Sequence, residues 1–71
     1  MVITNFGKNR HIMSIDLSSL TNWTEGVVQT FENAATRNSG NMTVKLSQAT
    51  RDMISESLLS TLTSKGYNIT T

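Results

Sequence analysis

The stretch NMTVKLSQATRDMISESLL, residues 41–59, decides which fold this chain is expected to adopt. Apolar and polar residues alternate across residues 42–46, a pattern typical of a half-buried β-strand. From residue 48 onward the apolar residues recur at helical spacing, and Ser47 at the junction is a good helix N-cap. The stretch therefore predicts a strand that leads directly into a helix. The alternative, which merges residues 42–46 with that helix, would give a mostly helical protein.

The chain that follows Ser47 predicts one long helix and one more strand. Helical spacing extends over residues 48–64, and the apolar stripe consists of Ile54, Leu58 and Leu62. Gly66 is a typical helix stop, because glycine adopts the left-handed conformation that ends many helices. The alternation that begins at Tyr67 then predicts a final short strand.

The first half of the chain contains two β-prone segments, residues 1–6 and 11–17, and residues 7–10 between them could close a hairpin. A helix is predicted over residues 22–37, with an apolar stripe of Leu20, Trp23, Val27, Phe31 and Ala34. Gly26 inside this helix costs about 1 kcal/mol relative to alanine. Packing must offset that cost, unless a neighbouring backbone comes close to Gly26.

These elements give the order ββαβαβ in a single domain of residues 1–71, an α+β or α/β fold. Alternation in the strands predicts a short sheet of three or four strands with one dry face. Right-handed crossovers would place two amphipathic helices on that face. The predicted core consists of Ile15, Leu17, Trp23, Val27, Phe31, Val44, Leu46, Ile54, Leu58, Leu62 and Ile69.

The composition narrows the chemistry that the chain can carry. With no cysteine, disulfides and thiolate metal sites are excluded. The single histidine, His11, cannot form a zinc or copper site alone, so no metal or other cofactor is expected. His11 and Asp16 would point to opposite faces of a regular strand, and no glycine-rich phosphate loop occurs. No catalytic residue is therefore predicted, and the chain is not expected to be an enzyme.

Charge and hydropathy narrow the range of partners. The formal net charge is +1, whereas proteins that grip phosphates usually carry a clear basic excess, so nucleic acid is not a favoured partner. No apolar run is long enough to cross a bilayer, and the first residues lack the pattern of a signal peptide. The expected location is cytoplasmic, without membrane contact.

Residues 42–66 resemble the strand and first helix of a ribbon–helix–helix repressor, a family whose paired strands enter the major groove of DNA. The resemblance implies that Thr43 and Lys45 would face the bases. The sequence departs from the family because only five residues follow Gly66, whereas the family has a second helix. Nucleic-acid binding is therefore the alternative function, through this strand or through the basic loop of residues 7–11. The residues that would serve it are Lys8, Arg10, Lys45 and Arg51.

The sequence favours a small non-catalytic interaction protein, accessory or regulatory, that binds another protein or itself. A domain of 71 residues without cysteine has few means of stabilisation besides association, and a homodimer is one form this could take. On a helix over residues 48–64, Met53 lies away from the apolar stripe and near Ala49. With Ile12 from the opposite sheet face, these residues form the predicted interaction surface. The Asn-, Ser- and Thr-rich composition also resembles that of small phage or mobile-element accessory proteins.

Overall fold

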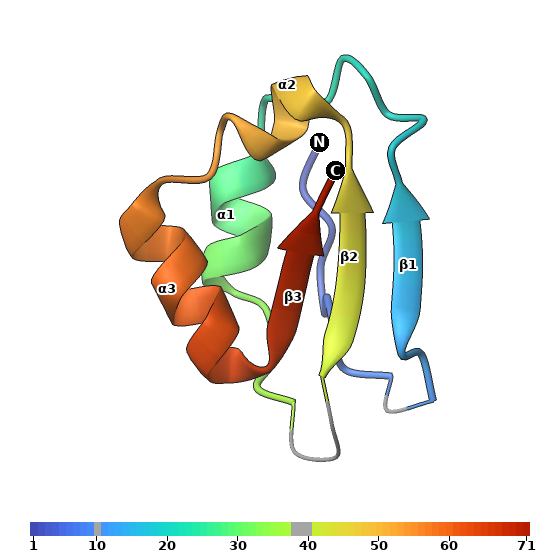
Figure 1. Ribbon diagram of the computed structural model, residues 1–71, viewed down its shortest axis with the longest axis vertical. Helices are drawn as coiled ribbons and strands as arrows, with labels where there is room; N and C mark the ends of the chain where they lie inside the picture. The colour runs from blue at the N-terminus through green and yellow to red at the C-terminus, as the bar shows by residue number, and fades with distance from the viewer. Residues whose placement is uncertain (10, 38–40) are drawn as a thin grey trace.

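A sheet of three parallel strands in the order β1-β2-β3 forms one layer of the protein (Figure 1). The computed structural model describes residues 1–9, 11–37 and 41–71. In chain order the elements are β1 (Ser14–Leu17), α1 (Val27–Glu32), β2 (Met42–Leu46), α2 (Gln48–Arg51), α3 (Glu56–Lys65) and β3 (Tyr67–Thr70). No helix crosses in front of the strands in Figure 1, and side chains of α1, α3 and β2 share one core cluster. Both long helices therefore cover the same face of the sheet.

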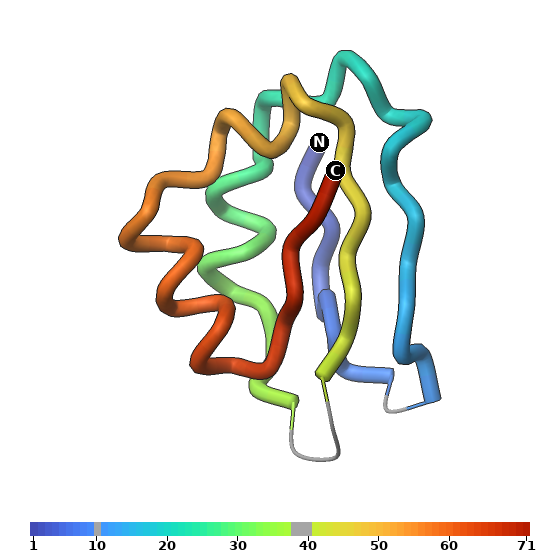
Figure 2. Tube along the Cα trace, viewed as in Figure 1, coloured from blue at the N-terminus to red at the C-terminus, as the bar shows by residue number. Residues whose placement is uncertain are grey.

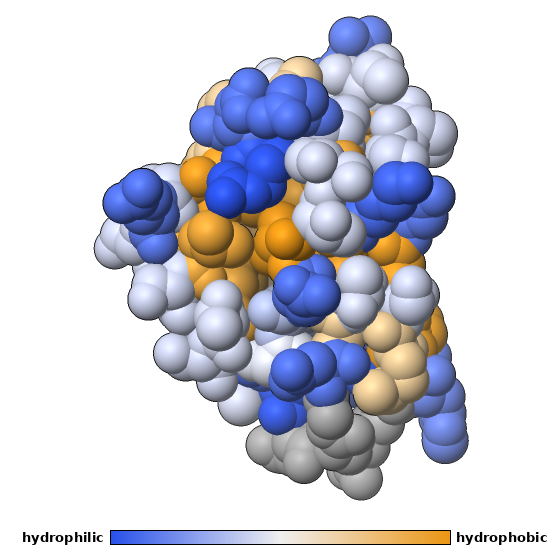
Figure 3. All heavy atoms as spheres, viewed as in Figure 1, coloured by the Kyte–Doolittle hydropathy of each residue, from blue (hydrophilic) through white to orange (hydrophobic). Residues whose placement is uncertain are grey.

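The register of the strands assigns each residue to one of the two faces. Val44, which lies between Ile15 and Ile69, is fully buried and faces the helices. Its neighbour Lys45 is exposed and faces the other way. The uncovered face, here called the open face, consequently presents polar side chains, and Figure 3 shows hydrophilic and intermediate residues there, with hydrophobic atoms visible between α3 and β3 and near β1. The residues of the open face are Ser14, Asp16, Thr43, Lys45, Asn68 and Thr70.

The strand at residues 42–46 and the final strand are confirmed, but the predicted order ββαβαβ is wrong, because residues 1–6 are not a strand. Their backbone finds other partners: the N–H of Ile3 donates to the hydroxyl of Thr30 over 3.0 Å. The chain then turns at Asn5, which has a φ of 59°. The N-terminal segment therefore packs on the α1 side of the sheet (Figure 2), and the observed order is βαβααβ.

The first helix is shorter than the predicted 22–37, because Gly26 has a left-handed φ of 87° and α1 begins after it. The N-terminal segment passes Gly26, as Met1 donates from its ammonium group to the carbonyl of Glu25 over 2.9 Å. Of the two alternatives given for Gly26, the structure shows the close approach of a neighbouring backbone, since the carbonyl oxygen of Met1 occupies the space that a Cβ at Gly26 would need. Trp23 precedes the helix and is nevertheless buried as predicted, with its indole Nε1 donating to the carbonyl of Met1.

The helix predicted over residues 48–64 is divided into α2 and α3. Ser47 caps α2 as predicted, in an extended conformation. A second cap interrupts the helix, because the hydroxyl of Ser55 accepts from the backbone N–H of Leu58 and starts α3. Ile54 lies in the segment between the two helices and is buried in the core.

Most of the predicted core is buried, and its partly buried members lie on the two edge strands: Ile15, Leu17 and Ile69. Phe6, Ala34, Met42 and Tyr67 also belong to the core, although the predicted core does not include them. The ring of Phe6 lies 5.1 Å from that of Phe31 and 5.8 Å from that of Tyr67. The N-terminal segment therefore supplies an aromatic side chain in place of a fourth strand.

Candidate protein-interaction surface

Strand β1 is an edge of the sheet and pairs only with β2 among the described residues. The N–H of Thr43 donates to the carbonyl of Met13 over 3.0 Å, which orients the odd-numbered residues of this strand toward β2. The backbone groups of Ser14 and Asp16 consequently point outward, where Figure 1 shows no neighbouring element. Unpaired groups of this kind are a template for another chain.

The start of β1 is held in place by Arg37. Its guanidinium donates to the carbonyl oxygens of Gly7, Asn9 and Ile12 over 2.7, 2.8 and 2.6 Å. Hydrogen bonds that involve a charged donor are about twice as strong as neutral ones. Arg37, which lies in the segment that follows α1, therefore fixes the loop before β1, so that the edge strand has a defined position.

The end of β1 is set by a local turn. The carboxylate of Asp16 accepts from the hydroxyl and from the backbone N–H of Ser18. The side-chain hydrogen bond from Ser18, followed by the backbone one, lowers the pKa of Asp16, and nearby Lys45 contributes less. The N–H of Leu20 then donates to the carbonyl of Leu17 over 3.1 Å and turns the chain away. The free edge is therefore short and ends at Leu17.

Apolar side chains accompany this edge. Ile12 is 38% exposed and Met13 is 45% exposed, and both directly precede β1. A small hollow of about 170 Å³ lies on the core side of β1, and its apolar lining includes Ile12, Ile15, Phe6 and Met42. We call the outer side of residues 12–17, with these side chains, the β1 edge.

The residues of the predicted interaction surface do not lie together. Met53 is 42% exposed and Ala49 is exposed, as the helical spacing predicts. Both lie in the segment that follows β2, at the carboxyl end of the sheet. Ile12 lies at the amino end of β1, and it lines the hollow on the core side rather than the open face. The structure thus separates Met53 and Ala49 from Ile12.

The cations named for nucleic-acid binding are also spread over the molecule. Lys8 lies in the loop before β1, at the amino end of the sheet. Lys45 and Arg51 lie near the carboxyl end, where Lys45 is in register with Asp16. Arg10 lies outside the described residues. Among the described positions these cations do not form one basic surface of the kind that phosphate binding uses.

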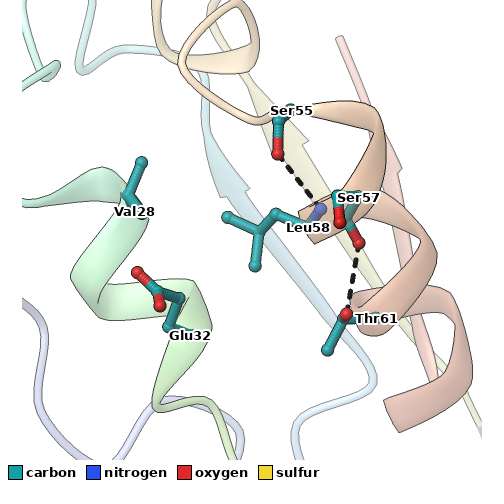
Figure 4. A pocket seen from close by; sticks show the side chains of 6 residues that line it. All are labelled: Val28, Glu32, Ser55, Ser57, Leu58 and Thr61. Carbon is teal, nitrogen blue, oxygen red and sulfur yellow. Dashed lines mark hydrogen bonds between the residues drawn. The ribbon is translucent and has the colours of Figure 1, made fainter.

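Two wider hollows lie elsewhere on the surface. One, of about 430 Å³, separates α1 from α3 (Figure 4), and it is lined by Val28, Glu32, Ser55, Ser57, Leu58 and Thr61. Two of its hydroxyls are engaged in α3, since Ser55 caps the helix and Thr61 donates to the carbonyl of Ser57. The second, of about 450 Å³, lies beside Arg51 and Thr70, where Gln48 donates to Asp52 over 2.7 Å. Neither hollow gathers free polar groups around a common point.

Within residues 1–9, 11–37 and 41–71, no three histidine or acidic side chains are grouped so that they could hold a metal ion. In those same ranges, no helix combines the length and the apolar character that crossing a bilayer requires. The β1 edge, with its outward backbone groups and exposed apolar side chains, is therefore taken as the candidate site.

No protein-family model, no curated protein and no solved structure matches this chain.

Proposed function

We propose that this chain is a small non-catalytic interaction protein, which binds another protein or a second copy of itself through the β1 edge. The observation that supports the proposal is an edge strand whose outward backbone groups lie next to the exposed side chains of Ile12 and Met13. A chain that added a strand here would gain backbone hydrogen bonds and bury apolar surface together.

The β1 edge has only part of the protection by which natural proteins keep sheet edges from pairing with other chains. Such edges are usually very short, carry lysine or proline or a bulge, or are covered by a helix or loop, and of these features β1 has the shortness, with four residues. Here residues 12–17 contain neither lysine nor proline, and Asp16 is their one charged residue. Complete burial of a side chain such as isoleucine or methionine contributes about 1.5–3 kcal/mol. Ile12 and Met13 could thus add to the affinity of a strand that docks beside them.

Site-specific photo-crosslinking tests the proposal. A benzophenone amino acid would replace Met13, and in a control variant it would replace Thr63, which is exposed on α3. The variants would be irradiated as purified protein and in an extract of the source organism. We expect a distinct higher-mass adduct with the probe at residue 13 and a much weaker one at residue 63.

A third variant, with the probe in place of Met53, examines the surface predicted from helical spacing. Adducts at residue 53 alone would support an interaction function but place its site in the segment between α2 and α3. The absence of specific adducts at residues 13 and 53, in both the purified protein and the extract, would contradict the proposed function.

A further inference from the structure

We propose that the partner of the β1 edge is a second copy of this chain, whose β1 pairs antiparallel with the first around a two-fold axis at Ile15. The inference rests on the proposed function and specifies its partner. It joins two sheets into one of six strands, in the order 3-2-1-1-2-3. Three independent features of the edge select this arrangement.

The first feature is the direction of the backbone groups. Ser14 and Asp16 present their N–H and C=O groups outward, whereas Ile15 lies between them and faces β2. With Ile15 on the axis, Ser14 of each copy lies opposite Asp16 of the other. Each such pair can exchange two N–H···O=C bonds, and the two-fold axis repeats the pair.

The second feature excludes the neighbouring registers. A shift that places Ser14 on the axis would pair Ile12 with Asp16, but the N–H of Ile12 already donates to the carbonyl of Asn9, and its carbonyl accepts from Arg37. A shift that places Asp16 on the axis would pair Ser14 with Ser18, whose N–H already donates to Asp16. Shifts by one residue would set the open face of one copy against the core face of the other. The register around Ile15 uses only backbone groups that are free.

The third feature is the match of charge and polarity. The same register sets Ser14 against Asp16, so no like charges meet, whereas the register centred on Asp16 would bring two carboxylates together. Ile15 meets Ile15, and Leu17 lies opposite Met13 of the second copy. The apolar side of the edge thereby continues across the two-fold axis, and the polar open face continues on the other side.

The small size of the β1 edge determines how strongly the two copies are expected to associate. Stable interfaces bury about 1,200–2,000 Å² in total. A strand of four residues with two flanking apolar side chains provides less than that. The dimer is therefore expected to be weak and concentration-dependent, with a sedimentation mass that rises from monomer toward dimer as the protein is concentrated.

The test uses charge changes at Ser14, which is exposed on the open face. Ser14→Lys would place a cation opposite Asp16 of the second copy, and Ser14→Glu would place a like charge there. We expect the dissociation constant from sedimentation equilibrium to fall with Ser14→Lys and to rise with Ser14→Glu, each by roughly 2- to 30-fold for two symmetric cross-strand pairs. Matched controls are Asn68→Lys and Asn68→Glu, which make the same charge changes on the far strand of the same face.

Each outcome decides the question. Opposite shifts at residue 14, with little change at residue 68, would support the antiparallel pair around Ile15. Weakening by both changes at Ser14, or equal effects at the two positions, would overturn it. A chain that stays monomeric at all concentrations, yet forms adducts with another protein through residue 13, would overturn the self-pairing and leave the proposed function standing.

Discussion

The carbonyl oxygen of Met1 occupies the space that a side chain at Gly26 would need, 1.9 Å from an ideal Cβ at that position. The same oxygen accepts from the indole Nε1 of Trp23 over 2.9 Å. One backbone group of the first residue is therefore enclosed by the turn that leads into α1. This contact fixes the N-terminal segment, which then carries Phe6 into the core.

Gly26→Ala is expected to destabilise the protein by at least about 2 kcal/mol, because it combines a left-handed φ of 87° with the steric conflict at Met1. Urea unfolding followed by circular dichroism would measure the change. Thr24→Ala serves as the control, since Thr24 is exposed in the same turn and its replacement should change stability by about 0.5 kcal/mol or less. Equal midpoints for the two variants would show that the N-terminal segment does not pack against Gly26.

Arg37→Met is expected to lower stability by about 2 kcal/mol or more, because three carbonyl oxygens before β1 lose a charged donor. Amide hydrogen exchange should also speed up in residues 7–9 and 11–13. Arg51→Met is the control, since Arg51 makes one longer bond, 3.3 Å, to the carbonyl of Ile54. If Arg51→Met proved as damaging as Arg37→Met, the role assigned to Arg37 would be mistaken.

Ser55→Ala is expected to cost about 1 kcal/mol, the usual loss when a helix N-cap hydroxyl is removed. Ser57→Ala is a matched change two residues later, at an exposed position within α3, and should have little effect. Thermal unfolding of both variants gives the comparison. No loss of stability for Ser55→Ala would indicate that Ser55 lies inside a continuous helix over residues 48–64 rather than at the start of a second helix.

The carboxyl of Asp16 should titrate below its usual range, because the hydrogen bonds from Ser18 favour the ionised form and lower its pKa. Since this folded-state pKa is depressed, the stability that Asp16 contributes is present above its unfolded pKa. That contribution is lost as the pH falls through the folded value, in the range below about pH 4. Ser18→Ala should raise the pKa, as measured by an NMR titration of the carboxyl carbon. An unchanged titration in that variant would count against the hydrogen bonds as the cause.

The local sequence pattern is sufficient to predict those elements whose structure is determined by neighbouring residues. The alternation in residues 42–46 and from Tyr67 onward predicted β2 and β3, because the side-chain period of a strand is read within a few residues. Ser47 was predicted as a cap for the same reason, since its hydroxyl bonds to an amide three residues away. Helical spacing also indicated that Met53 is exposed.

Tertiary contacts decided the rest, because the competing interactions join residues far apart in the chain. Residues 1–6 are β-prone, but the bond from Ile3 to Thr30 spans 27 residues and holds them outside the sheet. The backbone of Met1 comes so close to residue 26 that only glycine fits there, and the helical periodicity of the sequence does not indicate this contact. The candidate site shows the same division: the apolar residues around β1 can be read from the sequence. That β1 is a free edge depends on strand order, which sequence spacing does not specify and which packing on one face of the sheet determines.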